Sequence, residues 1–418
     1  MSTPLPALRA IETILIEHEG KPHFCLQDAS GYVDEQLLLS PHAFLVASCL
    51  DGANDAAAVQ AIFAEQCGGV HVPEDQILQV VAYLDQCGFL LTPRFLELRD
   101  RIQNAFHDAP TRVAAHAGRS YPDNPDELRA YIDGFFTADA GPGALGTPGD
   151  ADAPPLDGLI APHIDFLRGA AAYAHSYKHL HEAGPPRTAF IFGVAHCGGA
   201  TPFIATRKSF ETPFGVLETD QDAVDHIAAA CDWDIFADEL AHRKEHSIEF
   251  QAVMLGYLYG TAVRIVPILC APFSDDPELT DPSRIKRVAA FLEACRAYAA
   301  PPDRRVTVIA AADLAHVGKR FGDPFDIDDG VVAAVRARDT EDLAHATACD
   351  PERWYASVMR DGNTRKVCGL GCIYAALKTL DGRAAGKVLH YDYAPDPVGG
   401  IVSFASVGFS VYAREGGD

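Results

Sequence analysis

The sequence has no apolar run long enough to span a membrane. Its first residues, Met1 to Pro6, lack the basic start and apolar core of a secretory signal peptide. Its 11 cysteines show no paired CxxC spacing, which in a chain of 418 residues favours reduced thiols over a disulfide framework. We therefore expect a cytoplasmic protein that does not use a membrane.

Positive charge is also scarce. The chain has 34 Lys and Arg residues against 58 Asp and Glu residues, which gives a formal net charge of −24 at pH 7. Because surfaces for nucleic acid or anionic lipid need positive charge, we expect neither as the main partner. Apolar residues are abundant: 48% of the chain is hydrophobic, enough for a sizeable core, and the length allows two or three domains.

Residues 1–95 are predicted to form a small winged-helix-like domain. Ile11–Ile16 has the weak alternation of a strand, and Leu37–Leu50 is predicted to be a helix with Ser40 as its N-cap. Two further helices and a short strand are predicted over Asp55–Cys67, Glu74–Cys87 and Gly88–Leu91. Helices followed by a short strand are typical of a winged helix.

The same region resembles the PqqD-like family of small peptide-recognition modules. The resemblance rests on the segments "LSPHAFLVASCLDG", "AAAVQAIF" and "ILQVVAYLDQCGFLLTPRF", in this order. It carries no catalytic motif. Winged helices often bind DNA, but these helices have few Lys or Arg residues, so a peptide or protein is the expected ligand.

Residues 96–114 are predicted to be a connecting helix and linker, and residues 115–418 a second domain of the α/β class. Short apolar segments typical of buried strands cover Leu159–Ala161, Ala189–Ala195, Val263–Leu269 and Val306–Ala312. Helical segments separate them, which predicts a mostly parallel central sheet with helices on both faces. The last two strands, Val388–Tyr393 and Ile401–Tyr412, are predicted to pair as antiparallel edges.

Two of these strands end in a histidine. His163 follows Leu159–Ala161 and Pro162, and His196 ends the next strand. Each histidine alone is more simply explained as an ordinary loop residue, but the repeated pattern favours a shared site. Ligands of open α/β sheets bind outside the carboxyl ends of the strands, and imidazole is the commonest metal ligand. The sequence therefore predicts a metal site at this edge of the sheet.

Two histidines bind a metal weakly, so a third ligand is needed. The candidates are His246, Glu249, Asp313, His316 and Cys368. Asp313 and His316 directly follow the strand Val306–Ala312 and should emerge at the same end of the sheet. Cys368 precedes a predicted helix, whose N-terminal dipole is expected to lower the thiol pKa. Glu249 is expected to be a helix N-terminal carboxylate or a partner of a ligand, rather than a ligand itself.

Several blocks of the second domain resemble the Memo family, also called AmmeMemoRadiSam system protein B. The blocks are "LIAPHIDFLRG", "IFGVAHCG", "SFETPFGVLETD", "EHSIEFQAVML", "AADLAHVGKRF" and "VCGLGCIYAAL", and they occur in the order of the family. Together with "SYP" at 120–122 they cover about residues 115–412. The resemblance implies a fold similar to the class III extradiol dioxygenases, which hold non-haem iron with two histidines and a carboxylate.

In Memo-like proteins a cysteine stands in place of that carboxylate. The resemblance therefore implies His163, His196 and Cys368 as the metal ligands. It implies three catalytic residues: His246, at the position of the dioxygenase acid/base histidine, with Asp313 and His316 beside it in the pocket. Two imidazoles and a thiolate suit iron(II), copper or zinc, and iron is favoured because of the related fold.

The chain departs from the usual family pattern at two places. Asp165 adds a carboxylate that could bind the metal or orient an imidazole. Cys197 stands where a second histidine is usual.

Two functions remain open from the sequence. The first is a metal-dependent oxidoreductase of the dioxygenase type, and the second is a non-catalytic scaffold that binds a peptide or protein in the same pocket. The family name implies a radical-SAM protein and a third protein of the AmmeMemoRadiSam system as partners.

Overall fold

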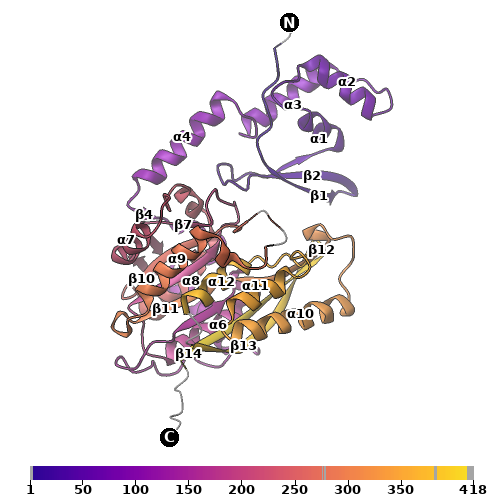
Figure 1. The fold of residues 1–418 in the computed structure, drawn as a ribbon. Helices are drawn as coiled ribbons and strands as arrows, with labels where there is room; N and C mark the ends of the chain where they lie inside the picture. Colours follow the sequence, from indigo (N-terminus) through magenta and orange to yellow (C-terminus); the bar gives the residue numbers. More distant parts are fainter. Residues whose placement is uncertain (1–2, 275, 277–278, 381–383, 412–418) are drawn as a thin grey trace. The chain divides into compact units, whose positions relative to one another are not determined.

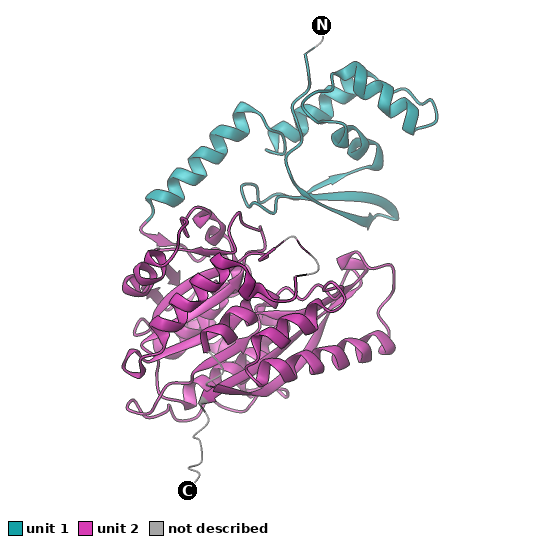
Figure 2. Cartoon of the chain, in the orientation of Figure 1, with its two compact units in different colours: residues 1–109 teal, residues 110–418 magenta. Residues whose placement is uncertain are grey.

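The computed structural model describes residues 3–274, 276, 279–380 and 384–411 (Figure 1). The chain divides into two compact units, residues 1–109 and residues 110–418 (Figure 2). The helix predicted to connect the domains is α4 (Pro93–Asp108), and it is the last element of unit 1. Among the described residues, no helix combines the length and apolarity needed to cross a membrane.

The described residues of unit 1 form a small antiparallel sheet and four helices. Its elements are β1 (Glu12–His18), β2 (Lys21–Gln27), β3 (Leu37–Leu39), α1 (Pro41–Ser48), α2 (Ala56–Gln66), α3 (Glu74–Gln86) and α4. The sheet order is β1-β2-β3, with Leu15 opposite Phe24 and Phe24 opposite Leu39. Buried side chains from the sheet and the first three helices, including Leu26, Phe63 and Leu84, form one hydrophobic core.

Two predictions for unit 1 are wrong in detail. Leu37–Leu50 is not one helix, because Leu37–Leu39 pairs with β2 as a strand before α1 begins. Ser40 separates the two elements, since its side chain accepts a hydrogen bond from the Ala43 amide and caps α1. Gly88–Leu91 is not a strand either, since only Leu90 forms an isolated bridge, to Leu8. The sheet is thus built almost wholly from residues before the helices.

Unit 2 contains the α/β fold that the sequence predicts. The helices are α5 (Pro125–Thr137), α6 (Phe166–Glu182), α7 (Gln221–Ala229), α8 (His246–Tyr259), α9 (Lys286–Ala299), α10 (Asp329–Thr347), α11 (Pro351–Met359) and α12 (Leu370–Leu380). The strands of the main sheet are β5 (Gly158–Ala161), β6 (Thr188–Val194), β7 (Phe203–Ala205), β10 (Arg264–Cys270), β11 (Val306–Ala311), β12 (Asp313–Gly318), β13 (Ala384–Asp396) and β14 (Gly400–Val411). A smaller sheet holds β4 (Thr111–Arg112), β8 (Ser209–Thr212) and β9 (Gly215–Leu217).

The main sheet is parallel at its centre and antiparallel around it. The order β5-β11-β6-β10 is parallel throughout, and β7 and β14 add antiparallel strands on the two sides. The carboxyl ends of the four central strands therefore meet at one edge of the sheet. His163 and His196 leave this edge directly after β5 and β6.

Alternating side chains of the central strands build two hydrophobic layers. Ile160, Phe192 and Val308 pack in one layer with α7, α9 and α12, while the neighbouring residues Leu159, Ile191 and Ile309 pack in the other with α5, α6 and α8. The strands are therefore buried on both faces, as expected for parallel strands. The predicted helices on both faces are confirmed (Figure 1).

The end of the chain corrects one prediction. β13 and β14 pair antiparallel as expected, but β14 is internal: opposite β13 it pairs with β12 through Gly400–Phe404 and with β5 through Val407–Phe409. Asp313 and His316 follow β11 as expected, and they belong to an additional strand, β12. Tyr412, the predicted last strand residue, lies outside the described residues.

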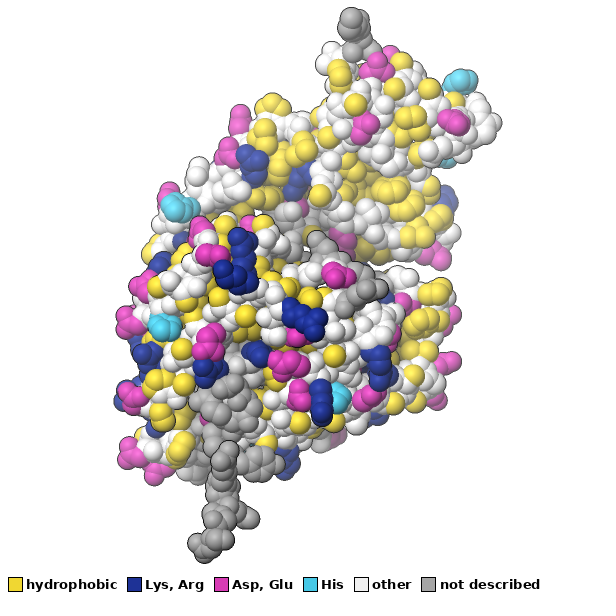
Figure 3. All heavy atoms as spheres, viewed as in Figure 1, with side chains coloured by type: hydrophobic (Ala, Val, Ile, Leu, Met, Phe, Trp, Pro, Cys, Tyr) yellow, Lys and Arg dark blue, Asp and Glu magenta, His cyan; other side chains and the backbone are white. Residues whose placement is uncertain are grey.

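On the face of the molecule seen in Figure 3, Lys and Arg side chains are dispersed and interspersed with Asp and Glu side chains. This pattern is that of a mixed charged surface.

Candidate metal centre

His163 is held rigidly as a neutral imidazole at the end of β5. Its backbone amide donates to Asp313 Oδ1 at 3.0 Å, and its Nδ1 lies 2.8 Å from the carbonyl oxygen of Ala311. Because that carbonyl can only accept, Nδ1 carries the proton and Nε2 keeps a free lone pair. Burial lowers the pKa of His163 to about 4, so the ring is neutral at pH 7.

His196 is oriented by Glu245, the N-cap residue of α8. The His196 amide donates to Glu245 Oε2 at 3.1 Å, and His196 Nδ1 lies 3.0 Å from both carboxylate oxygens. Desolvation lowers the pKa of His196, but the charge and hydrogen bonds of Glu245 outweigh it and raise the pKa above its usual value. With Nδ1 bonded to the carboxylate, Nε2 is the atom left to bind a ligand.

Cys368 reaches the same place from the segment before α12. Its Sγ lies 3.3 Å from His163 Nε2 and 3.7 Å from the carbonyl oxygen of Asp313. The next residue, Gly369, donates its amide to Asp313 O at 3.1 Å. A Cβ at Gly369 would lie 2.5 Å from Ala312 Cβ, so only glycine lets the segment approach the sheet this closely.

The predicted low thiol pKa at Cys368 is wrong. Desolvation raises the pKa well above its usual value, and the nearby Asp313 and Cys372 raise it further. Any favourable effect of the α12 dipole is therefore outweighed by burial. A metal that binds Cys368 as a thiolate must displace the thiol proton.

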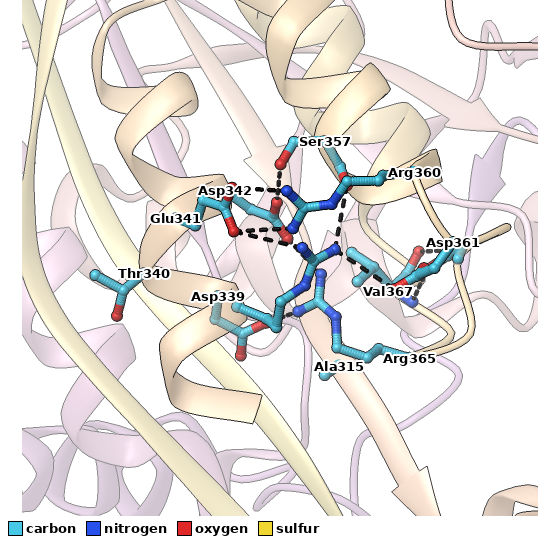
Figure 4. A network of polar contacts seen from close by, with 12 residues as sticks. Ala315, Asp339, Thr340, Glu341, Asp342, Ser357, Arg360, Asp361, Arg365 and Val367 are labelled. Atoms are coloured by element: carbon cyan, nitrogen blue, oxygen red, sulfur yellow. Dashed lines mark hydrogen bonds and ion pairs between the residues drawn. The ribbon is translucent and has the colours of Figure 1, made fainter. Parts of the chain in front are cut away.

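A buried ion-pair network anchors the segment that carries Cys368. The Arg365 guanidinium contacts Asp339 and Asp342, which both lie on α10 (Figure 4). Asp339 also accepts from Ser403 at 2.5 Å. The carbonyl oxygen of Arg365 accepts from the His316 amide at 2.7 Å, so the network ties this segment to β12 as well.

One ligand atom of each of His163, His196 and Cys368 lies within 4.8 Å of the others. A tetrahedral ion with usual bond lengths holds a nitrogen and a sulfur ligand about 3.6 Å apart. The 3.3 Å between His163 Nε2 and Cys368 Sγ is close to this value. The three residues therefore form a group that could hold a metal ion.

A second group of three residues shares His196. One ligand atom of each of His196, Glu245 and His246 also lies within 4.8 Å of the others. Glu245 is already engaged, because it accepts from the amides of His196 and Ser247. It therefore acts as the partner that orients the two imidazoles, and His163, His196 and Cys368 remain the better ligand set.

His246 lies beside this set rather than in it. It is the first residue of α8, and its ring stacks on His196 with a centroid distance of 4.8 Å. Its Nδ1 lies 3.3 Å from Glu245 Oε1. Desolvation lowers its pKa to about 3, so this imidazole is neutral at pH 7.

Asp313 and His316 line the same cavity from β12. Asp313 Oδ2 lies 3.6 Å from His163 Nε2, and burial raises the pKa of Asp313 to about 6. His316 packs edge-on against Phe321 at 5.1 Å between ring centroids, and burial lowers its pKa. The three residues predicted to be catalytic thus lie around the candidate metal centre.

The other acidic and thiol candidates have separate partners. Asp165 caps α6 and forms an ion pair with Arg168 at 2.6 Å. Cys197 is exposed, and Cys372 is buried. Glu249 is wholly buried and forms an ion pair with Arg112, as expected for a residue that is not a ligand.

Sequence reasoning missed the role of Glu245 and the segment around His116. Glu249 accepts from the amides of Ala115 at 3.1 Å and His116 at 2.9 Å, and from the Tyr121 hydroxyl. These bonds hold His116 with its ring 5.9 Å from His246. The only sequence signal for Glu245 is its position next to His246. This position does not indicate where the Glu245 side chain points.

The sequence of unit 2 is similar to those of known proteins. The sequence profile of Memo-like proteins matches residues 112–408. The chain belongs to the Memo-like family. The resemblance seen in its sequence blocks is therefore confirmed, and the candidate centre lies entirely within the part of the chain that matches the profile.

Curated relatives carry the name MEMO1 family protein. One from Aquifex aeolicus is 28% identical over 389 residues, which cover 92% of this chain and 96% of that relative. One from Methanopyrus kandleri is 31% identical over 306 residues, or 71% of this chain and 98% of that relative. One from Thermus thermophilus is 28% identical over 322 residues, which cover 77% of this chain and 88% of that relative. The Aquifex match is too long to fit within unit 2, so it includes much of unit 1 as well.

Proposed function

We propose that unit 2 binds one metal ion through His163 Nε2, His196 Nε2 and Cys368 Sγ. The observation that carries the proposal is the convergence of these atoms within 4.8 Å from three separate segments of the Memo-like unit. His163 supports it as a buried neutral imidazole, and His196 supports it with an Nδ1 engaged by a carboxylate. Two imidazoles and a thiolate suit iron(II), copper and zinc, and we favour iron(II) from the resemblance to the dioxygenase fold.

We propose further that the centre is an oxidoreductase site of the dioxygenase type. A redox metal held by these residues would polarise a substrate oxygen and supply electron exchange. The residues of the chain supply the rest: Glu245 keeps His196 in one tautomer, and His246, with its Nδ1 beside Glu245, offers a neutral imidazole that can accept a hydrogen bond from a bound substrate. Asp313, with a pKa of about 6, can exchange a proton near neutral pH.

Elemental analysis of anaerobically purified protein tests the metal site. We expect about one metal ion per wild-type chain and a large loss in His163→Ala, His196→Ala and Cys368→Ser. Cys197→Ser is the matched control, because it removes an exposed thiol one residue from His196 and should keep the metal. Equal metal content in Cys368→Ser and Cys197→Ser would show that the thiolate is not a ligand.

The dependence of metal affinity on pH gives a second test. Because Cys368 must lose a proton whose pKa burial raises, the affinity should fall as the pH is lowered toward neutrality and below. Titration calorimetry in buffers of different ionisation enthalpy should detect a released proton in the wild type. In Cys368→Ser this proton should be missing.

The alternative function is a scaffold that binds a peptide or a partner protein. Unit 1 favours it, because β1 is an edge strand of its sheet and can pair with an extended peptide. The radical-SAM protein of the same system is the partner that the family name suggests, and the cytoplasm is the compartment that the sequence predicts. A metal-free chain that binds this partner tightly would favour the scaffold over the oxidoreductase.

A further inference from the structure

Two cavities of different character adjoin the candidate centre. The histidine cavity has a volume of about 390 Å³ and is lined by His163, His196 and His246 among others. The thiol cavity has a volume of about 460 Å³ and is lined by His196 and Cys368. His196 borders both, and the ligand atoms of His163 and Cys368 are only 3.3 Å apart. The two cavities therefore lie on either side of the ligand set and share His196 as a lining residue.

The wall of the thiol cavity is mainly apolar and aromatic. Phe273, Tyr355, Met359 and Leu370 line it, and the rings of Phe273 and Tyr355 stack at 6.3 Å between centroids. Asp276 is the single residue with a formal charge at pH 7 among the described lining residues. A cavity of this size and lining suits an uncharged hydrocarbon or aromatic group.

The histidine cavity contains two arginines, Arg168 and Arg320, and three aspartates, Asp165, Asp313 and Asp396. Arg168 is engaged by Asp165 at 2.6 Å and lies 3.9 Å from Asp396. Arg320 also lines the cavity, and among the described residues no carboxylate lies within ion-pairing distance of it. Its guanidinium instead lies 5.9 Å from the centroid of Phe321. In a chain with a net charge of −24, an unpaired arginine in a cavity is a natural partner for an anionic group.

We infer that the centre takes an organic acid with an apolar body, the acid group on Arg320 in the histidine cavity and the body in the thiol cavity. The inference deepens the proposed function and rests on it for the site, because the ligand would lie against the metal between the two cavities. Arg320 is then a specificity-determining residue that distinguishes acids from neutral analogues.

Titration calorimetry with three small probes tests the inference. The probes are 3-phenylpropionate, its neutral amide 3-phenylpropanamide, and propionate, which lacks the apolar body. Wild-type protein should bind 3-phenylpropionate about tenfold more tightly than either of the others. Arg320→Gln should weaken binding of the acid about tenfold and leave the amide unchanged.

Lys319→Gln is the matched control for charge, because Lys319 is adjacent in sequence and exposed, and pairs with Asp326. It should leave the binding of both the acid and the amide unchanged. Met359→Trp fills the thiol cavity and should weaken the binding of the acid and of the amide alike. Thermal melting of each variant checks that the fold is intact.

Several results would overturn the inference: no binding of 3-phenylpropionate at millimolar concentration, an unchanged acid-to-amide ratio in Arg320→Gln, or propionate binding as tightly as 3-phenylpropionate. Metal analysis of the same wild-type preparation separates this inference from the proposed function. If the wild type holds no metal but the Arg320-dependent preference persists, the metal proposal fails and the inference stands. If metal binds and the preference is missing, the inference alone fails.

Discussion

Glu249→Gln should strongly destabilise unit 2. Both Glu249 and Arg112 have fully buried side chains, and their ion pair is joined by three further donors to the same carboxylate: Ala115 N, His116 N and the Tyr121 hydroxyl. Glutamine keeps the shape and an acceptor oxygen but removes the charge. The Arg112 cation then stays buried, with only the carbonyl oxygens of His242, Val113 and Glu245 as partners.

Removing one partner of a buried ion pair costs about 3–5 kcal/mol, because the other charge remains without compensation. We expect a loss of this size in the free energy of unfolding. The chain has two tryptophans, Trp233 and Trp354, and both belong to unit 2. Tryptophan fluorescence during urea unfolding therefore reports this unit selectively.

Glu352→Gln is the control, since it makes the same chemical change in a partly exposed pair with Lys378. Exposed pairs contribute about 0–1 kcal/mol, so the control should differ little from wild type. Adding Arg112→Met to Glu249→Gln should restore part of the lost stability by removing the unpaired cation. A Glu249→Gln protein within 1 kcal/mol of wild type would refute the reasoning.

Limited proteolysis should cut between about residues 96 and 120 and leave a stable fragment of unit 2; rapid degradation of that fragment would place the domain boundary elsewhere. His246→Ala should keep most of the bound metal and lose turnover with any substrate found, whereas a metal loss equal to that in His163→Ala would make His246 a ligand. Stability should fall as the pH drops from about 6.5 to 4, because burial lowers the pKa of His242 to about 4 and the unfolded chain takes up the proton first. In His242→Gln the dependence of unfolding free energy on pH over this range should decrease by roughly 1.4 kcal/mol per pH unit.

Local patterns were sufficient to predict the four central strands of unit 2. Each is a short apolar segment between helical ones. Because both faces of such a strand are buried, nearly all of its residues are hydrophobic. The positions of His163 and His196 follow from the same pattern, because residues after parallel strands share one edge of the sheet. The assignment of Cys368 as a ligand came from the family resemblance, since its position in the sequence does not distinguish it from the other candidate ligands.

Features that depend on distant segments could not be predicted. The place of β14 inside the sheet depends on its pairing with β5, about 240 residues earlier in the chain. The pKa of Cys368 is set by burial. The neighbouring sequence indicates the helix that follows Cys368 but not how deeply the thiol is buried. Glu245 orients His196 across 49 residues, and its sequence neighbourhood is the same whether its side chain faces the site or solvent.

The internal position of β14 has a consequence for synthesis of the protein on the ribosome. β5 pairs with β14 on one side, and among the described residues β14 is the last strand of the main sheet to be translated. Until it emerges, a growing chain exposes an unpaired edge of β5 at the centre of the sheet, where another chain can add a strand. Unit 1, whose elements all precede residue 110, can fold before this interval begins. Polypeptides arrested before residue 400 should therefore carry a folded unit 1 and an unfinished unit 2, and should be captured by chaperones more readily than the completed protein.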